Sequence, residues 1–477
     1  MRYLDLAIIA SYLVAITWFG ARFRKRQASL RDYFLGGRRA PWWAITLSIV
    51  SAETSTLTIV GTPGLSFTGN LGFLQIVFGY LLARVMISVL LLPQYFRGEM
   101  FTAYELMRRR FGERVRRVTA GIFLVTRALA EGVRVFAISL VISIVLGTGE
   151  TASIILIVGL TLFYTFEGGM TAVIWTDVVQ MCLYVAGAAV SLIVILAQIP
   201  GGWPHVAEIA SQSGKFKVFD FAFAPSMQFF SRTYTFWAGL LGGCFLTMAS
   251  HGTDQLMVQR LLSARDEAQS RAALLASWLV IFVQFSLFLI IGIALFVHYR
   301  DGHLPLPKAT DRIYPEFVWR NLPTGAAGLV IAAILAAAMA NLSAALNSLA
   351  STTVVDFVRG GGDSLGFARA MTVVWGVVLV AIGMLARHWG SVLESGLSIA
   401  SITLGLLLGV FLLGVLTSRV GEEAAIIGLF AGLAAILYVR YATPIAWTWW
   451  VMIGTAATFG GGCVASLFVP RSAEATA

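Results

Sequence analysis

Long apolar runs separated by short polar segments recur along the whole chain. A helix needs about 20 mostly apolar residues to cross the hydrocarbon layer of a membrane, and the runs have roughly that length. We therefore expect an all-α, polytopic membrane protein with about thirteen transmembrane helices. The predicted spans are 4–20, 42–66, 71–93, 118–146, 151–166, 171–198, 234–253, 272–298, 325–356, 367–386, 392–417, 422–440 and 446–468.

Composition supports a chain whose main partner is the lipid bilayer. Hydrophobic residue types make up 58% of the 477 residues and charged types 12%, whereas soluble domains carry roughly 25% charged residues. Three cysteines all fall within apolar spans and have no metal-ligand spacing, so neither a zinc site nor a disulfide framework is expected. The sequence shows no sign of an obligate protein partner.

The net charge of +10 comes from residues that set the orientation of the protein in the membrane, and it does not indicate nucleic-acid binding. Most Lys and Arg residues lie in short loops between apolar spans, and the side richer in them faces the cytoplasm. One side collects 21 of them and the other 10. The sequence thus predicts an external N-terminus, a cytoplasmic C-terminus and a multi-pass protein of the bacterial inner membrane, with no nucleic-acid partner.

The span 42–66 is unusually polar. Seven hydroxyl or carboxyl side chains fall between Ser48 and Thr58, and Gly61-Thr62-Pro63-Gly64 follows. Transporters use interrupted helices at mid-membrane, where freed carbonyl groups bind a cation. The alternative is a helix that packs on its neighbours through small residues.

The span 118–146 contains Arg127, Glu131 and Arg134 on one helical face. Spacings of four and three residues allow the carboxylate to pair with both guanidinium groups. The three side chains could form a structural clamp, or their spare positive charge could bind an anionic solute. Arg84 is a further buried cation, with no partner evident from the sequence.

Three other spans carry polar groups that suit a binding site. Asp177 lies near the start of the span 171–198, where a carboxylate fits a cation site or a proton relay, or caps backbone at the headgroup level. Small and polar residues form one stripe along 325–356, from position 337 to position 351. The glycine-rich span 234–253 ends in Ser250-His251-Gly252-Thr253-Asp254-Gln255 and could be a second broken helix.

Several separated motifs, in order, resemble the sodium:solute symporter family. The stretch Tyr164–Ala172 and the following Trp175-Thr176-Asp177 match its signature. Other family-like pieces are Asp32–Arg38, Thr253-Asp254-Gln255 and Leu346-Asn347-Ser348. The resemblance runs from about residue 4 to 468 and is closest to the iodide, monocarboxylate and multivitamin branch. The sugar branch has a glutamate where this chain has Leu74, which argues against a sugar.

The resemblance implies a LeuT-like core of two inverted five-helix repeats. Residues 1–41 would form the first helix and a basic loop, 42–199 the first repeat, and 200–233 an external loop. Residues 234–418 would form the second repeat, and 419–477 two peripheral helices and a tail.

The resemblance also implies sites by position. The main sodium site would use backbone carbonyls of Leu47, Val50 and Ala337, with Ala340 and Asn341 where the family has two serines. A second site would use Asp177 and Ser343. The candidate solute-binding residues are Glu53, Thr54, Gln75, Arg134, Ser250 and His251.

The expected function is secondary active transport, in which Na+ and a small organic solute, a carboxylate or other small anion, enter the cytoplasm together by alternating access. Proton coupling through Glu53 or Asp177, sodium-independent transport, and a transporter-like membrane sensor remain open. An enzyme is not expected, because no metal-ligand or nucleophile–base constellation is evident.

Overall fold

The computed structural model describes residues 2–22, 38–97, 100, 103–164, 170–223, 226–305, 309–357, 365–389 and 392–469. Regular structure in these ranges is helical, apart from one isolated bridge between Ala40 and Ala264. This confirms the all-α class. The signature residues 165–169 and the motif Asp32–Gly37 lie outside the described ranges.

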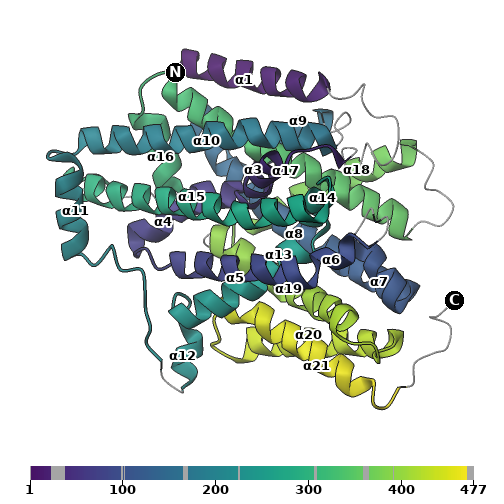
Figure 1. Ribbon diagram of the computed structural model, residues 1–477. Coiled ribbons are helices and arrows are strands. Elements are labelled where there is room, and N and C mark those ends of the chain that lie inside the picture. The colour runs from purple at the N-terminus through teal and green to yellow at the C-terminus, as the bar shows by residue number, and fades with distance from the viewer. Residues whose placement is uncertain are drawn as a thin grey trace.

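Long helices run side by side across the molecule (Figure 1). In chain order they are α1 (Tyr3–Ala21), α3 (Trp42–Glu53), α4 (Thr56–Thr68), α5 (Leu74–Leu90), α6 (Leu92–Tyr95), α7 (Ala103–Phe111), α8 (Glu113–Leu146), α9 (Glu150–Tyr164), α10 (Met170–Gln198), α11 (Gly202–Gln212), α12 (Met227–Ser231), η4 (Ala238–Gly242), α13 (Gly243–Gly252), α14 (Gln255–Leu262), α15 (Glu267–Asp301), η5 (Thr310–Arg312), α16 (Ile313–Asn321), α17 (Ala326–Phe357), α18 (Leu365–Ala386), α19 (Val392–Leu416), α20 (Glu422–Ala442), η6 (Trp447–Trp449) and α21 (Trp450–Ala465).

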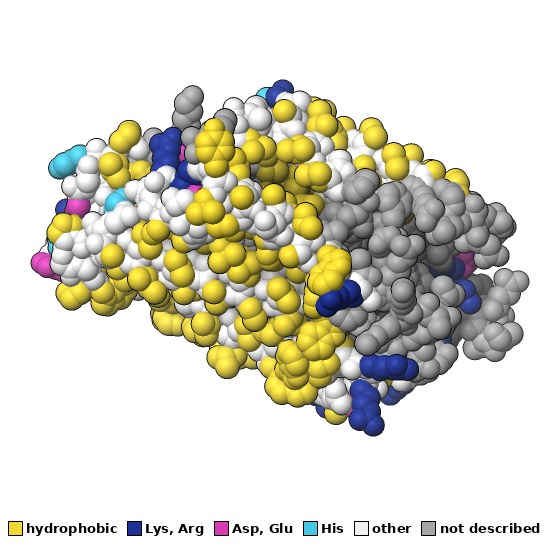
Figure 2. Space-filling model, turned by 90° about the horizontal axis from the view of Figure 1, so that it is seen from above, with side chains coloured by type: hydrophobic (Ala, Val, Ile, Leu, Met, Phe, Trp, Pro, Cys, Tyr) yellow, Lys and Arg dark blue, Asp and Glu magenta, His cyan; other side chains and the backbone are white. Residues whose placement is uncertain are grey.

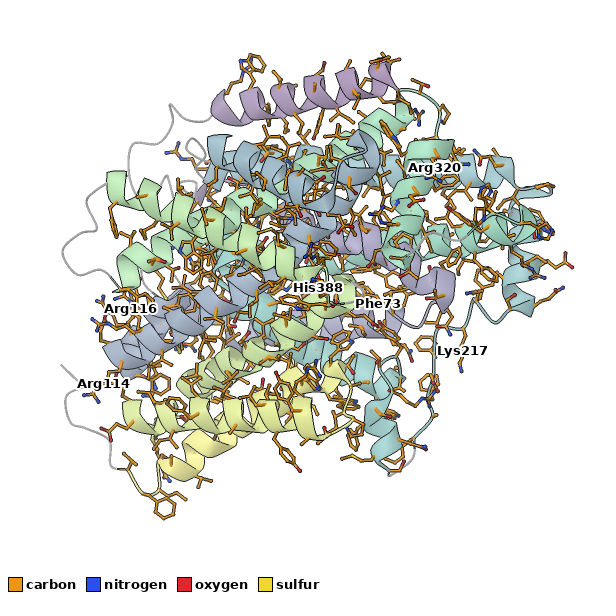
Figure 3. All side chains as sticks on the ribbon, turned by 180° about the vertical axis from the view of Figure 1, so that it is seen from behind. Phe73, Arg114, Arg116, Lys217, Arg320 and His388 are labelled. Atoms are coloured by element: carbon orange, nitrogen blue, oxygen red, sulfur yellow. The ribbon has the colours of Figure 1, made fainter. Side chains whose placement is uncertain are left out.

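The surface is that of a membrane protein. Within the described residues, 6 helices are long and apolar enough to span a bilayer, and up to 7 if the bent pair α3 and α4 forms one span. Figure 2 shows a broad hydrophobic face with Lys and Arg near its margins. Arg114 and Arg116 lie at one end of the bundle and Lys217 and Arg320 at the other (Figure 3).

The first interrupted helix breaks earlier than the glycine and proline residues suggested. Helices α3 and α4 meet at 65° around Thr54 and Ser55, whose ψ angles of 84° and 172° are not helical. Pro63 instead lies inside α4. The break therefore lies directly beside Glu53, the last residue of α3.

The second interrupted helix begins with a π-helical segment. The chain passes from η4 into α13, leaves the helix at Thr253 and starts α14 at Gln255. The Asp254 side chain caps α14 by accepting a hydrogen bond from the Leu256 amide. Single turns of π-helix often occur at functional sites, and here α13 ends at the predicted Ser250–Asp254 motif.

Helix α5 packs backbone-to-backbone against η4 and α13. A methyl group on Gly79 would lie 2.5 Å from the Gly239 carbonyl oxygen and 2.8 Å from the Cys244 amide nitrogen. No real Cβ tolerates such approaches to backbone atoms. Glycine at this position therefore sets the distance between two helices that line the site.

Helix α1 attaches to the start of α17 through a buried carboxylate. Asp5 is fully buried, and its Oδ1 accepts hydrogen bonds from the backbone amides of Gly325 (2.7 Å) and Gly328 (2.8 Å). Arg2 pairs with Asp5 at 2.8 Å and donates to the Leu322 carbonyl at the end of α16. The first helix thus caps the helix that carries the predicted cation ligands.

Helix α4 is capped at its other end from the segment between α11 and α12. The Lys215 ammonium donates to the carbonyls of Phe67 (2.6 Å) and Ser66 (3.3 Å) in the last turn of α4. It also lies 4.2 Å from the centre of the Phe296 ring. Burial lowers the pKa of Lys215, while the carbonyl groups and the ring favour its charged form.

Candidate functional site

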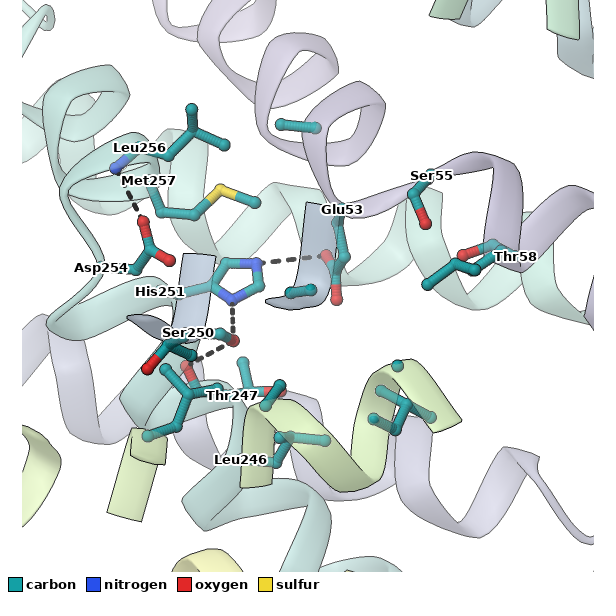
Figure 4. Close-up of a pocket in the computed structure, with 18 of the residues that line it drawn as sticks. Glu53, Ser55, Thr58, Leu246, Thr247, Ser250, His251, Asp254, Leu256 and Met257 are labelled. Carbon is teal, nitrogen blue, oxygen red and sulfur yellow. Dashed lines mark hydrogen bonds and ion pairs between the residues drawn. The ribbon is translucent and has the colours of Figure 1, made fainter. Parts of the chain in front are cut away.

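A cavity of about 150 Å³ lies beside the break between α3 and α4. Helices α5, α8, α13, α14, α15 and α19 contribute the rest of its wall (Figure 4). Polar and charged side chains from α3, α8 and α13 form part of the lining. The rest is largely apolar and includes Phe73, Phe285, Leu393, Leu397 and Leu404. Such a cavity suits a small amphipathic molecule.

Glu53 lies at the polar wall and is paired with Arg84. The Arg84 NH2 atom lies 2.5 Å from Glu53 Oε2, with the arginine side chain fully buried and the glutamate 11% exposed. Arg84 also donates to the Ser277 hydroxyl (2.9 Å) and the Tyr80 carbonyl (3.3 Å). This contact supplies the partner that the sequence did not reveal for Arg84.

His251 joins Glu53 to the second broken helix. Its Nε2 lies 3.3 Å from Glu53 Oε2, and its Nδ1 lies 2.9 Å from the Ser250 hydroxyl (Figure 4). A neutral imidazole with its proton on Nε2 satisfies both contacts, since Nδ1 then accepts from the hydroxyl group. Three predicted solute-binding residues, Glu53, Ser250 and His251, therefore lie together at the cavity.

The charged face of α8 forms the pairings expected from its spacing. Arg127 NH2 lies 2.8 Å from Glu131 Oε1, and Arg134 pairs with the same oxygen. Asp254 lies 3.6 Å from Arg127. Both arginines also line the cavity, and their buried Nε atoms have no acceptor within the described residues. The structural clamp predicted from the spacing is therefore present, and some guanidinium N–H groups of its two arginines have no hydrogen-bond acceptor among the described residues.

Thr54 and Gln75 are not among the residues that line the cavity. The Thr54 hydroxyl exchanges hydrogen bonds with the Gln284 amide on α15 (2.6 and 2.9 Å). The Gln75 amide donates to the Tyr234 carbonyl (3.3 Å) and accepts from the Asp220 amide (2.9 Å). Both are buried and hold neighbouring segments together, so a solute in this cavity would not reach their polar groups.

The candidate cation ligands lie in several environments. Leu47 and Val50 belong to α3, and the Val50 carbonyl already accepts from the Thr54 amide at 2.8 Å. On α17, Ala337 and Asn341 are buried, Ser343 is half-buried, and the Ala340 side chain lies outside the described part.

Asn341 faces the helix break rather than the middle of α3. With Ser55 and Thr56 it lines a second cavity of about 10 Å³, to which α8 also contributes. The oxygen atoms that meet α17 there belong to residues one turn beyond Val50. Helix α3 itself packs mainly on α10 and α15.

Asp177 has partners, contrary to its interpretation as a lone carboxylate. Its Oδ2 accepts from the Ser48 hydroxyl (2.6 Å) and from Arg260 (2.9 Å), and all three side chains are buried. Arg260 also donates to Ser48 at 3.0 Å. Arg260 is one of the 21 Lys and Arg residues counted from the sequence as loop charges on the cytoplasmic side, because it follows an apolar span. Folding of α14 against α3 brings it inside instead.

Some site residues had only weak sequence signals. Thr58, Tyr80 and Thr247 line the cavity, yet a hydroxyl group in an apolar span is common in helix packing. Asp254 had a stronger signal, because it interrupts an apolar stretch within a family-like motif. Its position beside Arg127 became evident only from the tertiary structure.

Comparison with known proteins gives a consistent result. The model of the sodium:solute symporter family matches residues 33–432. Sodium-coupled monocarboxylate transporter 2 of Bos taurus is 27% identical over 470 residues, which cover 94% of this chain and 75% of the relative. The sodium/iodide cotransporter of Homo sapiens is 29% identical, with 91% and 69% covered. The sodium/sialic acid symporter SiaT of Proteus mirabilis is 28% identical, with 98% and 96% covered.

Solved structures share the architecture. The substrate-bound, outward-open structure of a Na+-coupled sialic acid symporter superimposes with a TM-score of 0.85 at 26% identity, covering 98% of this chain and 99% of that one. Mhp1, a nucleobase-cation-symport-1 family transporter, has the same fold at a TM-score of 0.58 and 13% identity, with 92% and 96% covered. The fold is thus that of LeuT-like transporters, as the sequence resemblance implied.

Proposed function

The chain belongs to the sodium:solute symporter family, and on this premise we propose that it carries a small organic anion together with Na+ by alternating access. The observation that supports an anion is Arg134, which lines the cavity and shares the Glu131 carboxylate with Arg127, while Arg127 has Asp254 as a second partner at 3.6 Å. A buried donor without an acceptor costs about 1–3 kcal/mol. A solute carboxylate that pairs with Arg134, whose side chain is 24% exposed and lines the cavity, supplies a further acceptor for its guanidinium group.

The remaining charges at the cavity are largely balanced without a ligand. Glu53 is neutralised by Arg84, and Asp254 stands 3.6 Å from Arg127 while it caps α14. The cavity therefore has no carboxylate free to hold an ammonium group at short range. Its apolar wall fits an aliphatic or aromatic remainder, so we propose a monocarboxylate in preference to a polyhydroxylated acid.

We infer the membrane arrangement from the same family. About thirteen spans, repeats at 42–199 and 234–418, an external N-terminus and a bacterial inner membrane remain our proposal. Two observations support it. Helix α1 begins at the end of the bundle opposite to that where α21 ends (Figure 1). The breaks after α3 and α13 both lie beside the cavity.

Na+ would bind between the first broken helix and α17, with a further position near Asp177 and Ser343. We expect Asn341→Ala to raise the sodium concentration for half-maximal uptake at least about tenfold, since a buried oxygen ligand is lost. Uptake of radiolabelled pyruvate, lactate, benzoate and nicotinate into proteoliposomes is the assay. An unchanged sodium response, with normal protein yield, would place the ion elsewhere.

The substrate assignment is tested at Arg134. Arg134→Ala should raise the KM for the transported anion at least about tenfold, because a charge-assisted hydrogen bond contributes roughly 1.5–3 kcal/mol. The protein should still assemble, since Arg127 retains its contact with Glu131. Loss of folded protein without a change in KM would instead assign the triad to a structural clamp.

The number of ions follows from the energetics. One charge crossing 100 mV is worth about 2.3 kcal/mol, and a tenfold gradient adds about 1.4 kcal/mol. One Na+ with a monovalent anion moves no net charge, so a strong concentrator needs two Na+. Uptake that responds to an imposed voltage supports two ions, and voltage-independent uptake supports one.

Proton coupling is a second candidate, favoured by the contact between His251 and Glu53 at 3.3 Å. Asp177 is less suited to a relay because Arg260 holds it. Uptake driven by a pH gradient in sodium-free buffer would support this alternative over sodium coupling.

A further inference from the structure

The second cavity has the size of a single small ion. Its volume is about 10 Å³, and a cavity of roughly 10–15 Å³ holds one water molecule. An organic solute is too large for it. Its oxygen-bearing side chains are Ser55, Thr56, Glu131 and Asn341, from three different elements.

Glu131 lines this cavity, and one of its carboxylate oxygens lacks a hydrogen-bond partner among the described residues. Its Oε1 receives both Arg127 and Arg134. Its Oε2 is buried and has no hydrogen-bond partner within the described residues. The whole residue is only 1% exposed. A buried, unpartnered carboxylate oxygen is costly, so the structure calls for an occupant that carries positive charge or donates a hydrogen bond.

We propose that this cavity is a site for Na+, formed by Glu131, Ser55, Thr56 and Asn341, and filled when an anion engages Arg127 and Arg134. The inference rests on the proposed function and deepens it, because it names the step that links solute to ion. It differs from the family-derived sites in using the carboxylate of α8.

Charge balance gives the coupling. Without an anion, Arg127 and Arg134 both pair with Glu131, and Asp254 offsets part of the charge of Arg127. The positive charge that remains next to the small cavity, chiefly that of Arg134, repels a cation there. Ser55 also precedes the N-terminus of α4, whose dipole is positive, so an ion there depends on the full carboxylate charge. An anion on the arginines removes the repulsion and raises sodium affinity. By linkage, Na+ raises the affinity for the anion by the same factor.

Arg134 is the residue that connects the two cavities. It lines both of them and is 24% exposed in its side chain, while Arg127 borders only the larger one. Removal of its charge should therefore imitate the arrival of an anion.

The test measures binding of 22Na+ alone to the purified full chain, with no solute present. Arg134→Gln should bind Na+ about tenfold more tightly than the unmodified protein, since one nearby positive charge is gone. Adding Glu131→Gln to that variant should abolish the gain. The control is Arg109→Gln, which removes an arginine from an exposed pair with Glu105 and should leave sodium affinity unchanged.

A second variant tests the site by its size and removes no further charge. Val135 lines the small cavity, and Val135→Ile adds one methyl group there, so it should cancel the gain of Arg134→Gln. Saturable 22Na+ binding that Arg134→Gln does not tighten, or a gain that survives Glu131→Gln, would overturn the site while sodium coupling stands. No saturable binding in any variant would overturn both the site and sodium coupling.

Discussion

Replacing Arg84 with methionine should remove the main counter-charge of Glu53 at the cavity wall. Methionine has a similar length and fills the buried space, so the perturbation is chiefly electrostatic. The Glu53 carboxylate would keep only the His251 contact, at 3.3 Å. Because Glu53 is only 11% exposed, water in the cavity replaces the lost guanidinium only in part.

The expected cost is large. Removing one partner of a buried ion pair destabilises a protein by about 3–5 kcal/mol. The side-chain bonds of Arg84 to Ser277 and to the Tyr80 carbonyl are also lost, at about 0.5–1.5 kcal/mol each. We therefore expect Arg84→Met to lower the free energy of unfolding by at least about 4 kcal/mol.

A double-mutant cycle isolates the pair. Glu53→Gln with Arg84→Met leaves no unpaired charge, and it should be more stable than Arg84→Met alone by about 2–3 kcal/mol. The assay is reversible unfolding from mixed micelles by increasing SDS. The matched control is Arg109→Met in the exposed pair with Glu105, which should cost less than about 1 kcal/mol.

Two results would refute this reasoning. Equal stability of Arg84→Met and Arg109→Met would mean that the pair is effectively solvated. Strict additivity of Glu53→Gln and Arg84→Met would mean that the two groups do not interact in the folded protein.

Two further predictions concern helix packing. Gly79→Ala should prevent stable assembly, because its Cβ would lie 2.5 Å from a backbone oxygen, and the yield of monodisperse protein measures this. The control Gly159→Ala should give a normal yield, since its Cβ would have nothing within 4 Å. Equal yields of the two variants would contradict the packing described for Gly79. Asp5→Ala should lower the free energy of unfolding by about 2–3 kcal/mol, since two buried amides lose their acceptor, and Asp5→Asn should recover part of it in the same SDS titration.

Local spacing predicted local structure correctly. The pairing of Arg127, Glu131 and Arg134 follows from their separations of four and three residues, and the structure has it. The interruption of the first polar span was also predicted, although the break falls at Thr54 and Ser55 and not at Pro63. Both features depend on the geometry of a single helix, which the sequence encodes directly.

Ion pairs between residues of different helices could not be predicted from spacing along the chain. Arg84 meets Glu53 across 31 positions, and Arg260 meets Asp177 across 83. The sequence showed that these charges lie in or beside apolar segments and need partners, but several choices were equally compatible. Gln75 and Thr54 likewise have polar groups that suit a binding site, yet the fold turns them towards Tyr234 and Gln284.

The sequence by itself therefore determined an all-helical membrane protein of a sodium-coupled family, with broken helices and buried charges. Only the tertiary structure decided which of those charges face the cavity and which neutralise one another. The physical reason is that the apolar pattern fixes which residues are buried, while the rotation of each helix about its axis depends on close packing with its neighbours. One contact shows this clearly: Asp5 caps a helix that begins 320 positions later in the chain.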